Sequence, residues 1–155
     1  MRGTIDPGNR ALRLGRSSLP HQIYLVTTVT VERQPVFLDF HAGCAAARCF
    51  GDRAILRDTH MLSWVLMPDH AHWLIQLGEK DSLSGVANRL KSASARLVNR
   101  ALGKRGALWQ RSFYDHALRS EEDLRKIARY IVANPVRAGL VERVGGYPFW
   151  DAVWM

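Results

Sequence analysis

The pattern of hydrophobic and polar positions along the chain predicts four β-strands. Residues 23–31 (IYLVTTVTV) are dense in β-branched side chains, which favour a strand. Residues 61–67 (MLSWVLM) and 70–77 (HAHWLIQL) are two further apolar stretches, and the Pro-Asp pair between them predicts a tight hairpin turn. The fourth strand is expected over residues 108–118 (LWQRSFYDHAL).

Helical propensity and capping signals predict two helices between these strands. Residues 41–53 form an Ala-rich stretch with high helical propensity. A longer helix begins at Asp81 or Ser82, either of which can cap its N-terminus, and has apolar residues at helical spacing up to Leu102. Gly103 is expected to end this helix.

A last helix completes the predicted order of elements. Ser120 and Asp123 have the spacing of a capping box, and the helix is expected to run through Ala133 to an Asn-Pro pair. The order strand, helix, strand, strand, helix, strand, helix is typical of an α+β fold of the ferredoxin-like (RRM-like) type. We therefore expect an antiparallel sheet with helices on one face and an added C-terminal helix.

Two regions of the chain are expected to behave differently. Residues 1–19 are polar, contain Gly and Arg, and lack periodicity, which predicts a flexible basic tail. The tail could bind the flank of a nucleic acid or stay disordered, and the sequence leaves both open. Residues 20–155 are predicted to form a single domain.

Composition excludes several classes of protein. The chain has 155 residues, 47% hydrophobic and 23% charged, which is typical of a globular protein with a real core. No apolar run approaches the roughly 18 residues that span a bilayer, so no membrane association is expected. Cys44 and Cys49 are five residues apart and fall on different faces of a predicted helix, which argues against a disulfide or zinc site. A cytoplasmic protein is expected.

The charge of the chain is concentrated in its second half. The formal net charge is +8, and residues 89–143 contain 13 basic and 5 acidic residues, which gives 13 − 5 = +8 for that stretch alone. Only 4 of the 22 basic residues are lysines, so 22 − 4 = 18 are arginines. Because the arginine fork suits phosphate oxygens, a polyanion such as nucleic acid is a natural partner. A basic surface that serves only solubility is the alternative.

The strongest local signal for chemistry is the sequence His70-Ala71-His72. Residues i and i+2 of a strand project from the same face, so both imidazoles can approach one divalent cation. Two half-buried histidines that bond only to their neighbours are the alternative. Two nitrogen ligands do not complete a metal site, so a further ligand is required.

Tyr130 and Asn134 could complete such a site. The two residues are four apart near the end of the last predicted helix and therefore share a helical face. Asn134 offers an amide oxygen as a ligand, and Tyr130 offers a phenol oxygen as a nucleophile. Alternatively, Tyr130 packs in the core and Asn134 ends the helix before Pro135.

Four ordered motifs within residues 20–150 resemble the HUH (His-hydrophobic-His) single-tyrosine transposases. They are residues 67–73 (MPDHAHW), 89–93 (RLKSA), 109–116 (WQRSFYDH) followed by 121–124 (EEDL), and 130–141 (YIVANPVRAGLV). Within that family the motifs are most similar to the REP-associated tyrosine transposases, relatives of insertion-sequence transposases that act on repetitive extragenic palindromes.

The resemblance implies a role for each site residue. His70 and His72 would hold Mg²⁺ or Mn²⁺, Asn134 would be the third ligand, and Tyr130 would be the nucleophile. The family usually has Asn where Asp69 stands, so Asp69 would add a negative charge near the metal. Asp69 and His116 could contact the ligand side chains and support them, and a purely structural role for His116 is the alternative.

The resemblance also implies the substrate and the reaction. The partner would be single-stranded DNA with hairpin or palindromic repeats, cleaved and rejoined through a 5′-phosphotyrosine. The protein would act on the bacterial nucleoid, and a monomer is favoured over a homodimer. The residues expected to contact DNA are Arg89, Lys91, Arg96, Arg100, Arg111, Tyr114 and Arg137. Trp109 and Phe113 could also stack on bases but are expected in the core.

Two other functions remain open at this stage. The chain could be a non-catalytic binder of hairpin DNA or RNA, because ferredoxin-like sheets also serve as RNA-recognition modules. It could also be a metal-dependent hydrolase that uses His70, His72 and a carboxylate such as Asp69. Tyr114 competes with Tyr130 as the nucleophile, but no Asn follows it at helical spacing.

Overall fold

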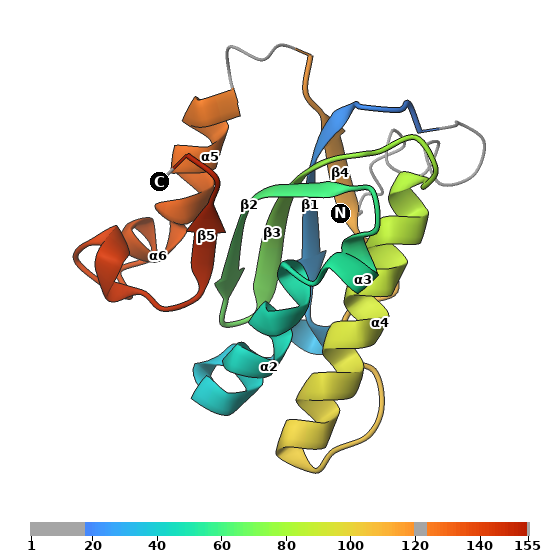
Figure 1. Cartoon of the computed structure of the whole chain (residues 1–155). Coiled ribbons are helices and arrows are strands. Elements are labelled where there is room, and N and C mark those ends of the chain that lie inside the picture. The colour runs from blue at the N-terminus through green and yellow to red at the C-terminus, as the bar shows by residue number, and fades with distance from the viewer. Residues whose placement is uncertain (1–17, 120–123, 155) are drawn as a thin grey trace.

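A five-stranded antiparallel sheet forms the centre of the protein (Figure 1). The computed structural model describes residues 18–119 and 124–154. The strands lie in the order β4-β1-β3-β2-β5 across the sheet. Their bounds are Ile23–Val29 for β1, His60–Met67 for β2, His70–Gln76 for β3, Tyr114–Ala117 for β4 and Trp150–Ala152 for β5.

The helices begin and end at local capping signals. They are α2 (Phe40–Phe50), α3 (Arg53–Leu56), α4 (Leu83–Leu102), α5 (Leu124–Val132) and α6 (Asn134–Arg137), with short 3₁₀ turns at Val31–Arg33, Val36–Leu38 and Val144–Gly146. Asp39 accepts a hydrogen bond from the backbone N–H of Ala42 and so caps α2, and Ser82 caps α4. Gly103 ends α4 with a positive φ of 63°. Within the described residues, no helix is both long and apolar enough to cross a membrane.

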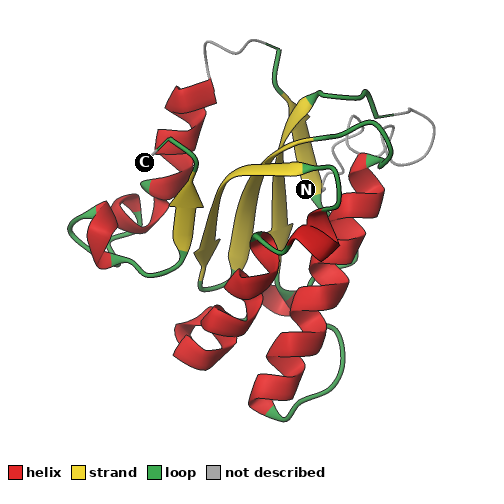
Figure 2. Cartoon of the chain, viewed as in Figure 1, coloured by secondary structure: helices red, strands yellow, loops and turns green. Residues whose placement is uncertain are grey.

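One face of the sheet is covered by α2 and α4. Tyr24, Leu66 and Trp73 point to this face and form a core with Phe50 of α2 and Leu90 of α4. The rings of Phe50 and Trp73 pack edge to face with their centroids 5.3 Å apart. Figure 2 shows α2, α3 and α4 gathered on this side of the sheet.

The opposite face of the sheet packs against α5. Val65 and Met67 of β2 and Leu74 of β3 form a second core with Ala128 and Ile131 of α5. These strand residues alternate along the sequence with those of the first core, as the pleat of a strand requires. The sheet therefore separates α5 from α2 and α4, and Figure 1 shows α5 beside β5 and away from those helices.

The ferredoxin-like α+β fold predicted from the sequence is confirmed. The central order β4-β1-β3-β2 and the two helices on one face are those of the ferredoxin-like pattern. The added helix α5 contains Tyr130, and it covers the second face instead of joining the other helices.

The fourth strand is shorter than predicted. The sequence indicated residues 108–118, whereas β4 covers Tyr114–Ala117. Lys91 Nζ donates hydrogen bonds to the carbonyl oxygens of Gln110 (2.8 Å) and Arg111 (3.1 Å), so these two oxygens bind a cation instead of a strand. The segment before β4 is consequently a loop.

Three short elements were not predicted. They are α3, α6 and the edge strand β5, which pairs with β2. The capping pair Ser120 and Asp123, and residues 1–17 of the predicted tail, lie outside the described residues.

Candidate metal and tyrosine site

His70 and His72 lie on the sheet face that packs against α5. His70 pairs in register with Met67, and His72 pairs with Val65, both of which belong to the core that contains Ile131 of α5. The two imidazole rings meet edge to face with centroids 4.9 Å apart, and both side chains are half-buried. The strand alternation that predicted a common face for the two histidines is therefore realised.

Each imidazole is oriented through its Nδ1 atom. Nδ1 of His72 lies 2.8 Å from Oγ1 of Thr27, and Nδ1 of His70 lies 2.7 Å from Oδ1 of Asp69. Because both Nδ1 atoms are engaged, the Nε2 atoms are the ones available to bind a cation. Metal-binding histidines typically use their second nitrogen for such a supporting contact.

Asp69 links His70 to Arg33. Arg33 Nη1 donates a hydrogen bond of 3.0 Å to Oδ2 of Asp69, whose other oxygen faces His70. Burial of the Asp69 carboxylate raises its pKa, but the hydrogen bonds and charges of His70 and Arg33 outweigh this and leave the pKa below its ordinary value. Asp69 therefore stays ionised and holds His70 from behind, so its carboxylate is already engaged and not free to act as the third ligand of a hydrolase.

The environment of His72 keeps its imidazole neutral. Burial, together with the charges of His70 and Arg137, lowers the pKa of His72 from 6.5 to about 4. A neutral imidazole is the form that binds a metal ion.

Tyr130 lies on the flank of α5. Its neighbour Ile131 is buried against the sheet, whereas the Tyr130 side chain is 62% exposed. The guanidinium carbon of Arg137 sits 3.6 Å from the centre of the Tyr130 ring. The helix that carries Tyr130 packs against the histidine side of the sheet, and Arg137 stacks on the Tyr130 ring.

Asn134 follows at the start of α6 and is half-buried. Its Nδ2 donates a hydrogen bond of 3.0 Å to the carbonyl oxygen of Ile131, which leaves Oδ1 free for another contact. Within the described part of the chain, no three His, Cys, Asp or Glu side chains gather closely enough to hold a metal ion. A cation at the histidine pair would therefore need a neutral oxygen, and the amide oxygen of Asn134 is of the right chemical type.

Two of the cations expected to contact DNA have partners inside the protein. Both nitrogens of the Arg89 fork bind the Asp81 carboxylate, at 3.1 and 2.7 Å, and its Nε binds the carbonyl oxygen of Ile55. Lys91 binds the carbonyl oxygens that precede β4. These two residues stabilise the fold, and the prediction that they contact DNA has no support from their geometry.

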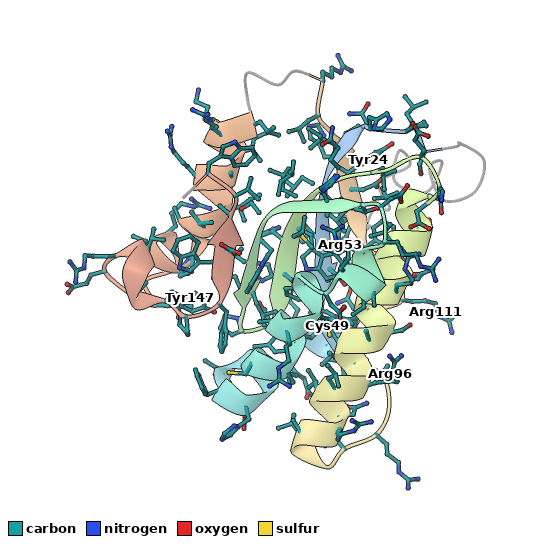
Figure 3. The ribbon with its side chains drawn as sticks, viewed as in Figure 1. Tyr24, Cys49, Arg53, Arg96, Arg111 and Tyr147 are labelled. Carbon is teal, nitrogen blue, oxygen red and sulfur yellow. The ribbon has the colours of Figure 1, made fainter. Side chains whose placement is uncertain are left out.

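Three of the other predicted cations, Arg96, Arg100 and Arg111, are exposed but lie away from the histidines. Arg96 and Arg100 project into solvent from α4, which covers the opposite face of the sheet. Arg111 is exposed in the loop before β4. Figure 3 shows Arg96 and Arg111 on the α4 side of the molecule, whereas Tyr147 lies near α6.

Tyr114 and His116 lie on the edge strand β4, on the same face of the sheet as the two histidines of β3. Tyr114 pairs in register with Thr27, which itself pairs with His72, so the three residues form one row across the sheet. His116 occupies the next position on the same face, paired with Leu25. Tyr114 is 51% exposed, as a base-stacking residue must be, whereas Trp109 and Phe113 are buried as the sequence favoured.

Sequence reasoning missed Thr27 and Arg33. Thr27 stands in a β-branched run in which a threonine is unremarkable, and only the pairing of β1 with β3 brings it to His72. Its alternation with buried Val26 and Thr28 was the one usable signal that it faces the histidine side. Nothing in the sequence marks Arg33 as the partner of Asp69.

Comparisons with known proteins give one consistent result. Residues 20–134 match the model of the family described as "Transposase IS200 like". The chain is 33% identical over 89 residues to the REP-associated tyrosine transposase of Escherichia coli K12, covering 56% of this chain and 50% of the relative. It is 34% identical over 94 residues, 54% of this chain and 53% of the relative, to a Haemophilus influenzae protein named as a candidate of the same kind.

The chain thus spans about half the length of these curated relatives. A solved structure of a REP-associated tyrosine transposase bound to a REP hairpin is similar over a larger part. It has a TM-score of 0.67 and 26% identity, and the similarity covers 87% of this chain and 79% of that one.

Proposed function

Because the chain belongs to the IS200-like transposase family, we propose that it cuts and rejoins single-stranded DNA at hairpin-forming repeats. Tyr130 is the nucleophile of this proposal, and His70, His72 and Asn134 hold Mg²⁺ or Mn²⁺. One observation supports it above all: Ile131, next to Tyr130, packs with Val65 and Met67, the strand partners of the two histidines.

The donor atoms fit a divalent cation. Within the described residues, Nε2 of His70, Nε2 of His72 and Oδ1 of Asn134 have no hydrogen-bond partner and are suitable ligands, and Thr27 and Asp69 contact the other nitrogens of the two rings. When bound, the cation would supply positive charge to the scissile phosphate. Three protein ligands would not complete the coordination of Mg²⁺ or Mn²⁺, so phosphate oxygens could bind the same cation.

The proposed chemistry takes place at the Tyr130 oxygen. The phenol oxygen attacks the scissile phosphorus in line, a bond from Tyr130 to the 5′-phosphate forms, and the bond from phosphorus to the 3′-oxygen breaks. The phenol proton leaves and the departing 3′-oxygen gains a proton. Because the phosphotyrosine keeps the energy of the phosphodiester, a second 3′-hydroxyl can reverse the step without ATP.

The arrangement of cations supports a path for the DNA. Exposed Arg96 and Arg100 on α4 suit a duplex stem, and Arg111 and Tyr114 lie at the β4 edge of the sheet. A single strand that leaves the stem can pass round this edge and reach His72, which shares a row with Tyr114. In the related solved structure, the transposase is bound to a REP hairpin.

The test is the formation of a covalent adduct. Labelled hairpin oligonucleotides with single-stranded flanks are incubated with the full chain and Mn²⁺, and the products are separated under denaturing conditions. We expect an adduct with the wild-type protein and with Tyr114→Phe, and none with Tyr130→Phe, which should bind the same DNA.

Other outcomes would replace this proposal. DNA binding by the wild-type protein without any adduct would point to the non-catalytic binder. An adduct that persists in Tyr130→Phe and disappears in Tyr114→Phe would move the nucleophile to β4.

A further inference from the structure

Arg137 and Tyr130 form a stacked pair on the outside of the protein. The guanidinium carbon of Arg137 lies 3.6 Å from the centre of the Tyr130 ring, and both side chains are exposed to solvent. Within residues 18–119 and 124–154, the Arg137 side chain forms no hydrogen bond or ion pair. Its stacking on the phenol is therefore the contact that fixes its position.

Stacking leaves the hydrogen-bonding edge of Arg137 unused. The five N–H groups of a guanidinium lie in its plane, whereas the contact with the Tyr130 ring uses its flat face. A planar fork with free N–H groups matches the oxygens of a phosphate better than a point charge does. By contrast, the guanidinium of Arg89 on α4 already donates two hydrogen bonds to the Asp81 carboxylate.

The backbone places this fork in the same segment as the candidate nucleophile and the candidate ligand Asn134. Arg137 ends the short helix α6, which begins at Asn134 directly after the helix of Tyr130. The helix α5, whose Tyr130 ring Arg137 contacts, packs against the sheet face that carries His70 and His72. One side chain therefore contacts the candidate nucleophile from a helix that begins at the candidate ligand Asn134.

We propose that Arg137 binds the scissile phosphate through its N–H edge while its flat face holds the Tyr130 ring beside that phosphate. This inference rests on the proposed function, because it assigns Arg137 a catalytic contact in the same reaction. It predicts that Arg137 acts on the rate of Tyr130 attack, and not as one more contact to the DNA stem. The geometry of the fork also predicts that lysine is an incomplete replacement.

The first test measures adduct formation in single turnover at saturating protein, so that hairpin affinity does not enter the rate. Arg137→Gln should slow the step by about 100-fold, and Arg137→Lys by about tenfold, because lysine keeps the charge but loses the fork. The matched control is Arg129→Gln, which removes an exposed arginine from the same segment and should leave the rate within about twofold. Equal rates for Arg137→Gln and Arg129→Gln would overturn the inference while leaving the proposed function intact.

The second test needs no DNA and no adduct. The Nε–Hε signal of Arg137 is identified in an NMR spectrum by its loss in Arg137→Gln, and inorganic phosphate is the probe. The signal should shift with phosphate in the wild-type protein and in Tyr130→Phe, which keeps the ring, and the shift should be much weaker in Tyr130→Leu.

The two tests separate the two ideas. One outcome is that no hairpin yields an adduct, but phosphate shifts the Arg137 signal in the wild-type protein and in Tyr130→Phe and not in Tyr130→Leu. In that case the proposed function fails and the phosphate site remains. A signal that ignores phosphate, or responds equally in Tyr130→Phe and Tyr130→Leu, would contradict the inference whatever the adduct assay shows.

Discussion

Oγ1 of Thr27 lies 2.8 Å from Nδ1 of His72, and the two residues are partners in the register of β1 and β3. The contact engages Nδ1 of His72 and leaves Nε2 as the nitrogen available to a cation. Asp69 does the same for His70 at 2.7 Å. In the proposed function, these two neighbours would prepare the histidine pair for a cation without binding it themselves.

Replacing Thr27 by Val should weaken metal binding without unfolding the protein. Valine keeps the β-branched shape of threonine but removes the hydroxyl, so the His72 ring loses its anchor. Loss of such a supporting contact typically lowers metal affinity by about 10- to 100-fold. Calorimetric titration of the metal-free protein with Mn²⁺ measures the change.

Thr27→Ser is the matched control, because serine keeps the hydroxyl. It should retain most of the wild-type affinity for Mn²⁺. Equal affinities for Thr27→Val and the wild-type protein would show that the Thr27 hydroxyl does not prepare the site.

Replacing Asp69 tests the other anchor. Asp69→Ala removes the acceptor of the His70 ring and the partner of Arg33, so Mn²⁺ affinity should fall by about 10- to 100-fold. The Mn²⁺ affinity of Asp69→Asn should fall less, because the amide oxygen of asparagine still accepts a hydrogen bond from Nδ1 of His70. The same calorimetric titration compares them, and an Asn variant weaker than the Ala variant would argue against this role.

The fold was predictable from the sequence where a local pattern carries the information. The period-two strand over residues 70–77 and the capped helix that ends at Gly103 were predicted nearly to the residue. The strand β5 is three residues long and depends on pairing with β2, which no local pattern reveals. The start of β4 was misplaced because Lys91 takes the backbone oxygens that a strand would have used.

In the candidate site, the residues within the sequence motifs were predictable, and the residues that the fold brings to them were not. The common face of His70 and His72 follows from strand alternation, and family membership followed from four ordered motifs and is confirmed. The role of Thr27 depends on a register that joins residues 45 positions apart. The sequence also could not show that Arg89 is paired within the protein and Arg96 is exposed, because the fold brings Asp81 to Arg89.

Two arginines on α4 should therefore respond differently to the same substitution. Arg89→Gln breaks the paired fork with Asp81 and should lower the free energy of unfolding by roughly 1–3 kcal/mol. Arg96→Gln removes an exposed side chain and should change that free energy by less than about 0.5 kcal/mol. Urea denaturation followed by circular dichroism measures both.

For DNA binding, Arg96→Gln should have a larger effect than Arg89→Gln. Arg96→Gln should weaken hairpin binding and reduce the slope of log affinity against log salt by about 1, as for the loss of one phosphate contact. Arg89→Gln should leave that slope unchanged under conditions in which the variant is folded. Identical slopes for Arg96→Gln and the wild-type protein would remove Arg96 from the DNA surface.

The metal-free protein should lose stability in acid because of His72. Burial, with the charges of His70 and Arg137, lowers the pKa of His72 from 6.5 to about 4, so between these values the unfolded chain binds a proton that the folded protein does not. The contribution of His72 is thus fully present above pH 6.5 and is lost as the pH falls toward 4. A shift of this size corresponds to about 3 kcal/mol.

The effect of His72 is isolated by comparison with His72→Asn, since all other ionisable residues are the same in both proteins. Urea denaturation in the presence of a chelator at pH 7, 5.5 and 4.5 gives the free energy of unfolding of each. The wild-type protein should lose about 2–3 kcal/mol more than His72→Asn over this range, because asparagine has no proton to gain. Parallel curves for the two proteins would mean that the folded protein accepts the proton on His72 as readily as the unfolded chain does, and that the ring is not held neutral for a cation.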